Sequence, residues 1–125
     1  RMPVPIGEFI SARVYNRRLR SQNNITSMDC VAFIDVVKGV ETASALSWKN
    51  PEEIHTICHL VRRYAQAGHD FCVIIPYDAQ RAAIERQLKA ENLSHDAIFN
   101  VNSFQGHEAD YVVVSVVRTD APGFL

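Results

Sequence analysis

The stretch of residues 102–110 concentrates side chains that can bind a polar ligand. It combines a hydroxyl, amides, an imidazole and two carboxylates, and it lies between two apolar segments. Gly106 permits a tight turn or a close approach of the backbone. A short loop with so many hydrogen-bonding groups at the edge of a sheet is typical of a polar-ligand site. The alternative is a solvated loop whose Phe104 fills the core.

A second candidate segment covers residues 75–80, where an apolar strand is predicted to end and a helix to begin. The amides of a helix's first turn can receive a phosphate, and the ring of Tyr77 can stack on a base. The alternative is an ordinary strand-to-helix turn in which Asp78 caps the helix. Composition alone does not choose between the two.

Arg1 is a third candidate. Its guanidinium is permanently charged, carries forked donors that match phosphate oxygens, and can stabilise the charge of phosphoryl transfer beside a γ-phosphate. Without further context, an arginine in this position is more often an ordinary surface residue.

Other chemistry has weaker support. His55 and His59 are one helical turn apart, a spacing able to bind a metal, but no third ligand is evident and no metal is expected. Four arginines between residues 13 and 20 form a basic cluster that can meet phosphates, although such runs are more often solvated. The sequence contains neither GxxxxGK[ST] nor GxGxxG, and no nucleophile–base pair can be argued.

Apolar patterning predicts the elements that position these segments. Nearly continuous apolar runs indicate buried strands over residues 30–37, 71–76, 97–101 and 111–117. Helices are predicted over residues 51–67 and 78–91, and a short one over 7–15, after a proline-containing start that disfavours helix. For the helix over 51–67, Asn50 is the expected N-cap and Gly68 the expected C-terminal stop.

This order of strands and helices predicts an α/β fold. Continuous rather than alternating apolar runs favour a mainly parallel sheet with helices on both faces, a three-layer domain of Rossmann or RecA type. Ligands of such sheets lie beyond the carboxyl ends of the strands. We therefore expect the site among residues 37–50, 76–80 and 102–110.

Composition sets outer limits. A chain of 125 residues, 47% hydrophobic and 22% charged, is about one globular domain rather than a disordered, collagenous or coiled-coil chain. The net charge of -1 means that any contact with nucleic acid needs a local basic patch. No apolar run is long enough to span a membrane. Cys30, Cys58 and Cys72 lack CxxC spacing and are expected to be buried reduced thiols of an intracellular protein, in cytoplasm or nucleus.

Three ordered motifs give a specific resemblance. Residues 101–118 read VNSFQGHEADYVVVSVVR, residues 75–80 read IPYDAQ, and the chain begins RMP. All three resemble motifs of superfamily 1B helicases. The first resembles motif V, which reads V-x-S-F-Q-G-x-E-x-D and is followed by a strand ending S-x-V-R. The second resembles the I-x-P-Y-x-x-Q segment, and the third the tail of the Q-Y-R-M-H-P motif. The group is the one that contains the nonsense-mediated-decay helicase and senataxin. The resemblance spans nearly the whole chain.

The resemblance implies a role for each motif in an ATP-dependent helicase. The chain would be the second RecA-like domain, 2A, with residues 1–30 as its leading segment. Arg1 would reach the γ-phosphate, Glu108 would contact the ribose with Gly106 shaping its loop, and Gln105 would lie close to the nucleotide. The resemblance also assigns three residues to contact with a single strand of RNA or DNA: Pro76, Tyr77 and Ser103. Gln80 would support the loop of Pro76 and Tyr77.

The resemblance also predicts what the chain lacks. His107 stands where the family commonly has arginine or lysine. The sequence starts inside one motif and ends before the arginine-rich motif VI, so an excised fragment is expected. Binding of ATP and Mg²⁺ is expected to require the P-loop and the carboxylates of a separate domain 1A. Alone it is expected to be inactive, and an exposed sheet edge predicts self-association. The alternative function is a noncatalytic protein- or RNA-interaction module on a helicase-like fold.

Overall fold

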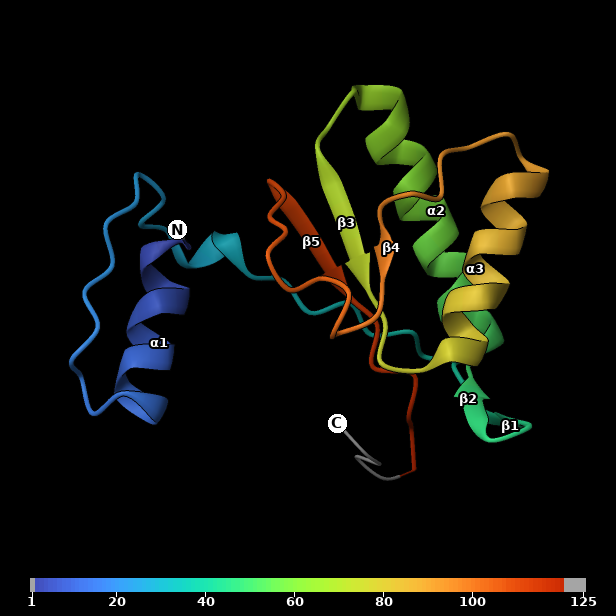
Figure 1. The fold of residues 1–125 in the computed structure, drawn as a ribbon, viewed down its shortest axis with the longest axis horizontal. Helices are drawn as coiled ribbons and strands as arrows, with labels where there is room; N and C mark the ends of the chain where they lie inside the picture. The colour runs from blue at the N-terminus through green and yellow to red at the C-terminus, as the bar shows by residue number, and fades with distance from the viewer. Residues whose placement is uncertain (1, 121–125) are drawn as a thin grey trace. The chain divides into compact units, whose positions relative to one another are not determined.

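The computed structural model describes residues 2–120, which fall into two compact units with the boundary in the chain between Asp35 and Val36. Figure 1 shows the elements of each unit, and each unit is treated by itself.

The first unit is built on helix α1 (Val4–Val14), followed by the short 3₁₀ helix η1 (Met28–Cys30). The predicted start at residue 7 is wrong, because the helix already begins at Val4 with Pro3 at the N-cap and a second proline in the first turn. Proline is tolerated there because the N–H groups of the first turn have no acceptor within the helix. Ser11 holds the chain that returns along the helix: its hydroxyl donates to Leu19 O at 2.9 Å and accepts from Leu19 N at 3.0 Å.

The strand predicted over residues 30–37 is absent. The segment contains no strand after η1, and Phe33 is 97% exposed. A strand forms only where a neighbouring strand pairs with its N–H and C=O groups, and this segment crosses the boundary between the two units instead. Its apolar pattern therefore gave the wrong burial as well as the wrong element.

The second unit contains a parallel sheet of three strands, in the order β4-β3-β5. The central strand β3 (Phe71–Ile74) pairs with β4 (Ile98–Phe99) on one side and with β5 (Tyr111–Val114) on the other. In this register, Val73 lies opposite both Ile98 and Val113. The predicted α/β class with a parallel sheet is confirmed.

Helices α2 (Pro51–Ala67) and α3 (Asp78–Ala90) pack against each other beside this sheet (Figure 1). Both contribute to one buried cluster that includes Val73 and Ile98, so both cover the same face of the sheet. Helices on both faces were expected, and within the second unit both helices lie on this one face. On the opposite face Val112 and Val114 are exposed, and neither α2 nor α3 covers them.

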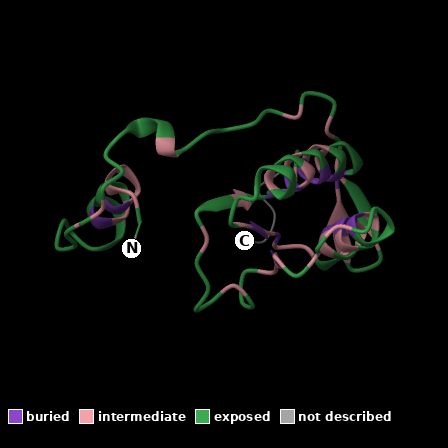
Figure 2. Cartoon of the chain, turned by 90° about the horizontal axis from the view of Figure 1, so that it is seen from above, coloured by how far each residue is buried: buried purple, intermediate pink, exposed green. Residues whose placement is uncertain are grey.

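The caps of α2 are as predicted. The Asn50 side chain accepts from Glu53 N at 3.2 Å, and Gly68 closes the helix with a φ of 69°, which a glycine adopts without strain. The apolar stripe of α2 supplies much of the core (purple in Figure 2) through Ile54, Ile57, Cys58 and Val61.

A two-stranded antiparallel hairpin precedes α2 and was not predicted. Strand β1 (Thr42–Ser44) pairs with β2 (Ser47–Lys49), and the turn between them exposes Leu46 completely. None of the helices within residues 2–120 is both long and apolar enough to cross a membrane.

Candidate functional site

Two of the predicted ligand segments leave the sheet at the same edge. Strands β3 and β4 are parallel neighbours, so their carboxyl ends meet at one edge. Pro76 and Tyr77 follow β3, and residues 100–110 follow β4 (Figure 1). The expectation that these segments share an edge is met.

The loop of residues 100–110 crosses from the carboxyl end of β4 to the start of β5. Asn100 and Ser103 tie its beginning together: Ser103 N donates to Asn100 Oδ1 at 2.7 Å, and Asn100 N donates to Ser103 Oγ at 3.0 Å. The Ser103 hydroxyl in turn donates to Asn100 O at 3.2 Å. At the other end, Asp110 N donates to Asp70 Oδ2, just before β3. Because Ser103 is bonded to Asn100, the residue directly after β4, it lies near the carboxyl edge of the sheet.

An aromatic cluster anchors the middle of this loop. The Phe104 and His107 rings lie 5.6 and 4.8 Å from the ring of Phe99, the last residue of β4. Phe104 is only half-buried and is not part of the main core, so its predicted place in that core is wrong. His107 contributes a ring contact where the family commonly carries a positive charge.

The loop presents its other candidate residues to solvent. Gln105, Gly106 and Glu108 are all exposed. Gly106 has a φ of 86°, and a Cβ built there would meet no atom within 4 Å. Glycine is therefore favoured by the left-handed backbone and not by crowding. Glu108 lies between His107, at the carboxyl end of β4, and Asp110, at the return to β5.

The turn from β3 into α3 differs from the prediction in one detail. Asp78 is the first residue of α3 and pairs with Arg81 at 3.4 Å, so it does not cap the helix. Tyr77 occupies the N-cap without a side-chain bond to the helix. The hairpin supplies a hydroxyl instead, because Ala79 N donates to Ser47 Oγ at 3.2 Å. Pro76 and Tyr77 are both half-buried.

Gln80 is fully buried and joins three elements behind this turn. Its Oε1 accepts from Asn50 N at 2.7 Å, and its Nε2 donates to Ser115 Oγ at 3.0 Å. Ser115 donates in turn to the Glu53 carboxylate. The helix starts of α2 and α3 are thus bonded to the chain that follows β5. A supporting role for Gln80 was expected, and the structure shows how it is achieved.

The same network fixes a sharp bend after β5. Val117 is buried with a φ of 65°, although a β-branched residue rarely adopts a left-handed backbone. Both oxygens of Glu53 accept from Val117 N at 3.2 Å, and Asn50 Nδ2 donates to Val117 O at 3.3 Å. Arg118 N donates to Val116 O at 2.6 Å across the bend. Such strain persists only where the surroundings determine the conformation.

The bend directs Arg118 onto the hairpin. Its Nε donates to Glu41 Oε2 at 2.8 Å, and its guanidinium lies 4.2 Å from the centre of the Trp48 ring. The hydrogen bond from Arg118, together with one from Thr119 N, lowers the pKa of Glu41 to about 2. The same pair, with a smaller contribution from Tyr77, raises the pKa of Arg118.

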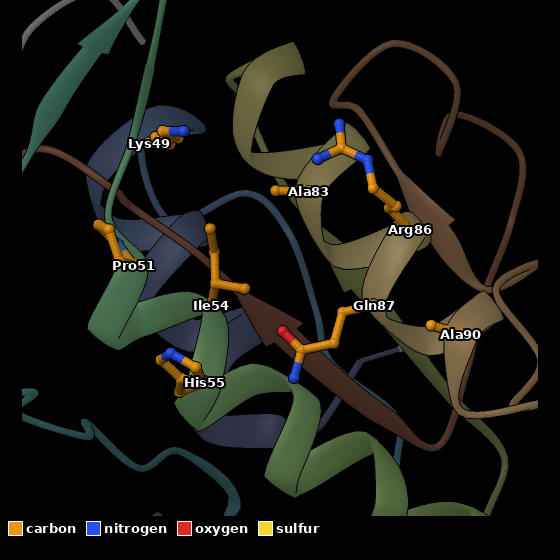
Figure 3. Close-up of a pocket in the computed structure, with 8 residues that line it drawn as sticks. All are labelled: Lys49, Pro51, Ile54, His55, Ala83, Arg86, Gln87 and Ala90. Atoms are coloured by element: carbon orange, nitrogen blue, oxygen red, sulfur yellow. The ribbon is translucent and has the colours of Figure 1, made fainter.

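A groove of the second unit lies elsewhere. It has a volume of about 390 Å³ between the outer sides of α2 and α3, and Gln87 reaches across it from α3 toward α2 (Figure 3). None of the predicted site residues lines it. The loops of residues 76–80 and 100–110 are therefore separate from this groove.

The remaining candidates divide between the units. Arg1 lies outside the described residues, and the arginines at 13, 17, 18 and 20 are exposed in the first unit. His55 and His59 are exposed on α2, and residues 2–120 contain no group of side chains suited to a metal. Cys58 and Cys72 are buried and free as predicted, and burial raises the pKa of each thiol, whereas Cys30 is only half-buried.

Sequence reasoning missed the residues that brace the site: Glu41, Glu53, Ser115 and Arg118. For two of them a signal was present, since Ser115 and Arg118 are the S and R of the S-x-V-R ending of motif V. Glu41 and Glu53 carry no such signal, because each meets its partner only after the chain has folded.

Comparison with known proteins identifies the family of the chain. The sequence profile of the family AAA_12, described as an AAA domain, matches residues 1–125. The chain belongs to this family. It is 30% identical to an uncharacterized ATP-dependent helicase of Methanocaldococcus jannaschii, in an alignment covering 100% of the chain and 22% of that protein.

Two further relatives fall in the expected group. One is the regulator of nonsense transcripts 1 of Caenorhabditis elegans, 30% identical over 96% of the chain and 13% of the relative. The other is the human probable helicase senataxin, 26% identical over 97% of the chain and 5% of the relative. The resemblance to superfamily 1B helicases is confirmed, and the AAA_12 chain spans less than a quarter of each of these relatives.

Proposed function

We propose that this AAA_12 chain is the second RecA-like domain, 2A, of an ATP-dependent superfamily 1 helicase. The observation that carries the proposal is the shared edge of β3 and β4, from which both candidate loops emerge. The helicase names of the relatives support the same reading. The working enzyme would combine this domain with a domain 1A that holds the P-loop and the magnesium ligands.

Pro76, Tyr77 and Ser103 would form this domain's part of the path for a single strand of RNA or DNA. Tyr77 supplies a ring for a base, and the Ser103 turn supplies backbone and hydroxyl groups for phosphates. Helicases of this type move along a strand whatever its sequence, and contacts to backbone and base faces meet that requirement.

Arg1, Gln105, Gly106 and Glu108 would form this domain's side of the ATP cleft. Glu108 is an exposed carboxylate and can accept hydrogen bonds from ribose hydroxyls. Mg²⁺-ATP, held mainly by domain 1A, supplies the phosphoryl group that is transferred to water. Because the sequence contains no P-loop, we propose that the 125-residue chain alone does not hydrolyse ATP. Magnesium-dependent turnover by the chain above a protein-free control would contradict this.

The test uses a longer protein that carries this domain together with its domain 1A. Glu108→Ala should weaken ATP binding about ten- to 150-fold, since a lost hydrogen bond to a charged group costs about 1.5–3 kcal/mol. Arg1→Ala should lower turnover more than binding. Glu52→Ala is the matched control, because it also removes an exposed carboxylate, and Glu52 belongs to α2 and to neither candidate loop. ATP binding that is equally unaffected in the Glu108 and Glu52 variants would remove the nucleotide role.

Two further parts of the proposal concern setting and association. The buried thiols of Cys58 and Cys72 fit an intracellular location, in cytoplasm or nucleus. Val112 and Val114 on the open face beside the outer edge of β5 favour self-association of the isolated chain. Light scattering should show mass rising with concentration, and a monomer at millimolar concentration would contradict this part.

A further inference from the structure

Arg118 is held from several sides in a place that sequence reasoning left without a role. Its side chain is only 15% exposed, and the Glu41 side chain paired with it is 6% exposed. The pair is 2.8 Å apart and joins residues that are 77 positions apart in the chain. Trp48 of β2 covers one face of the guanidinium.

Tyr77 is a second partner of Arg118, since its side chain adds a contribution, smaller than that of Glu41, to the raised pKa of the guanidinium. The tyrosine that the proposed function assigns to nucleic acid is therefore held by the same arginine that Glu41 and Trp48 hold. Ser47, on the same hairpin as Trp48, accepts a hydrogen bond from the N–H of Ala79, which lies two residues after Tyr77. The hairpin thus contacts the turn of residues 76–80 directly through Ser47, and Trp48 of the hairpin packs on the arginine that interacts with Tyr77.

The strained bend at Val117 is part of this arrangement. The buried valine keeps a φ of 65° because Glu53 and Asn50 bind its N–H and C=O groups. An extended Val117 would carry the following residue along the line of β5. The left-handed bend turns the chain so that Arg118 meets the hairpin and Tyr77.

We propose that Arg118 is a positioning residue that fixes the Tyr77 ring for stacking on a nucleic-acid base, with Glu41 and Trp48 of the β1–β2 side holding Arg118 in place. The inference rests on the proposed function, since it assigns to Tyr77 a contact with a single strand. It goes further by making the hairpin and the chain after β5 part of that site.

The contacts argue against a direct role for Arg118 on a phosphate. Its charge is already compensated by Glu41, one face is covered by Trp48, and most of the side chain is buried. An arginine that neutralises a phosphate would contribute to the salt dependence of binding, whereas one that places a neutral ring would not. The two roles therefore differ in a measurable quantity.

The experiment combines a double-mutant cycle with a salt titration on the full chain. Fluorescein-labelled oligo(U) and oligo(dT) of twelve nucleotides are titrated with the wild type, Tyr77→Ala, Arg118→Lys and the double variant, and binding is followed by fluorescence anisotropy. Lysine keeps the charge but loses the planar fork and the stacking face. Arg86→Lys is the matched control, since Arg86 is exposed on α3 and forms no ion pair within residues 2–120.

Tyr77→Ala should weaken binding about tenfold, in line with the loss of one stacked base. Arg118→Lys should weaken it roughly three- to tenfold, the double variant should bind no more weakly than Tyr77→Ala, and the salt slope should stay unchanged. Arg86→Lys should leave affinity as it is. Trp48, the one tryptophan of the sequence, should become more accessible to iodide quenching in Arg118→Lys and in Glu41→Gln.

The outcomes separate the inference from the proposed function. Additive losses, or full affinity in Arg118→Lys, would overturn the positioning role and leave Tyr77 as a nucleic-acid contact. Binding that Tyr77→Ala does not weaken would overturn the proposed contact and the positioning role together. Unchanged quenching of Trp48 in both Arg118→Lys and Glu41→Gln would show that Arg118 is not held as described, which also overturns the inference.

Discussion

Gln80→Ala is the perturbation that most directly tests how the candidate site is built. Gln80 is fully buried and bonds Asn50 N and Ser115 Oγ, thereby linking the starts of α2 and α3 to the chain after β5. The alanine variant leaves both partner groups in place without the amide that joined them. We expect the second unit to lose stability and the Pro76–Tyr77 turn to lose its support.

The magnitude follows from what each partner loses. Asn50 N becomes a buried donor without an acceptor, a loss of about 1–3 kcal/mol, and Ser115 loses a bond worth about 0.5–1.5 kcal/mol. The removed methylene contributes about 0.8 kcal/mol. The free energy of unfolding should therefore fall by about 2–5 kcal/mol, and the melting midpoint by at least about 10 °C.

Urea unfolding followed by tryptophan fluorescence measures this effect in the relevant unit, because the single tryptophan, Trp48, lies in β2. The matched control is Gln87→Ala on the same helix. Gln87 is half-buried, and its Nε2 lies 3.5 Å from Glu91, so its loss should change stability by less than about 0.5 kcal/mol. The dependence on urea should keep its slope in both variants.

Gln80→Met separates hydrogen bonding from packing, because methionine keeps the volume and removes the amide. It should lose most of what alanine loses. If Gln80→Met is as stable as the wild type, packing and not the polar network stabilises this turn. If Gln80→Ala is no less stable than Gln87→Ala, the network contributes nothing and the reasoning is refuted.

Two further predictions concern the bend and the loop. The folded pKa of Glu41 is about 2, below its ordinary value of 4.5, so its pairing with Arg118 stabilises the fold above about pH 4.5 and is lost as the pH falls toward 2. Urea midpoints should show Glu41→Gln less stable at pH 6, with the gap to the wild type closing near pH 2; a constant gap would contradict this. Gly106→Ala should oppose the left-handed backbone by about 1–2 kcal/mol and speed hydrogen exchange of His107 N, which donates to Phe104 O at 2.9 Å, roughly 5–30-fold. Unchanged exchange there would show that the loop does not need the glycine.

Local signals were sufficient for the two helices and the parallel strands of the second unit, although not for its hairpin. The bounds of α2 follow from Asn50, Pro51 and Gly68, whose preferences act within a few residues and do not depend on the rest of the fold. The apolar runs of β3 and β5 predicted a parallel sheet, because strands covered by helices carry little polar surface. Family motifs then pointed to the two loops that share an edge of that sheet.

Local signals failed where an element depends on a distant partner. Residues 30–37 are as apolar as a buried strand, yet no strand of the described chain pairs with them. Asp78 is a suitable cap by type, but the hydroxyl that reaches the start of α3 comes from Ser47 on the hairpin. A residue's type states what it can bind, whereas its partner is decided by which segments meet.

The sequence by itself determined the caps of α2, the class of fold and the loops that carry polar chemistry. The tertiary structure alone decided the contacts behind those loops: Gln80 with Ser115 and Arg118 with Glu41. The first pair joins residues 35 positions apart in the chain, and the second joins residues 77 positions apart. No periodicity or spacing rule reaches so far, because such bonds form only after the sheet and its helices have brought the segments together.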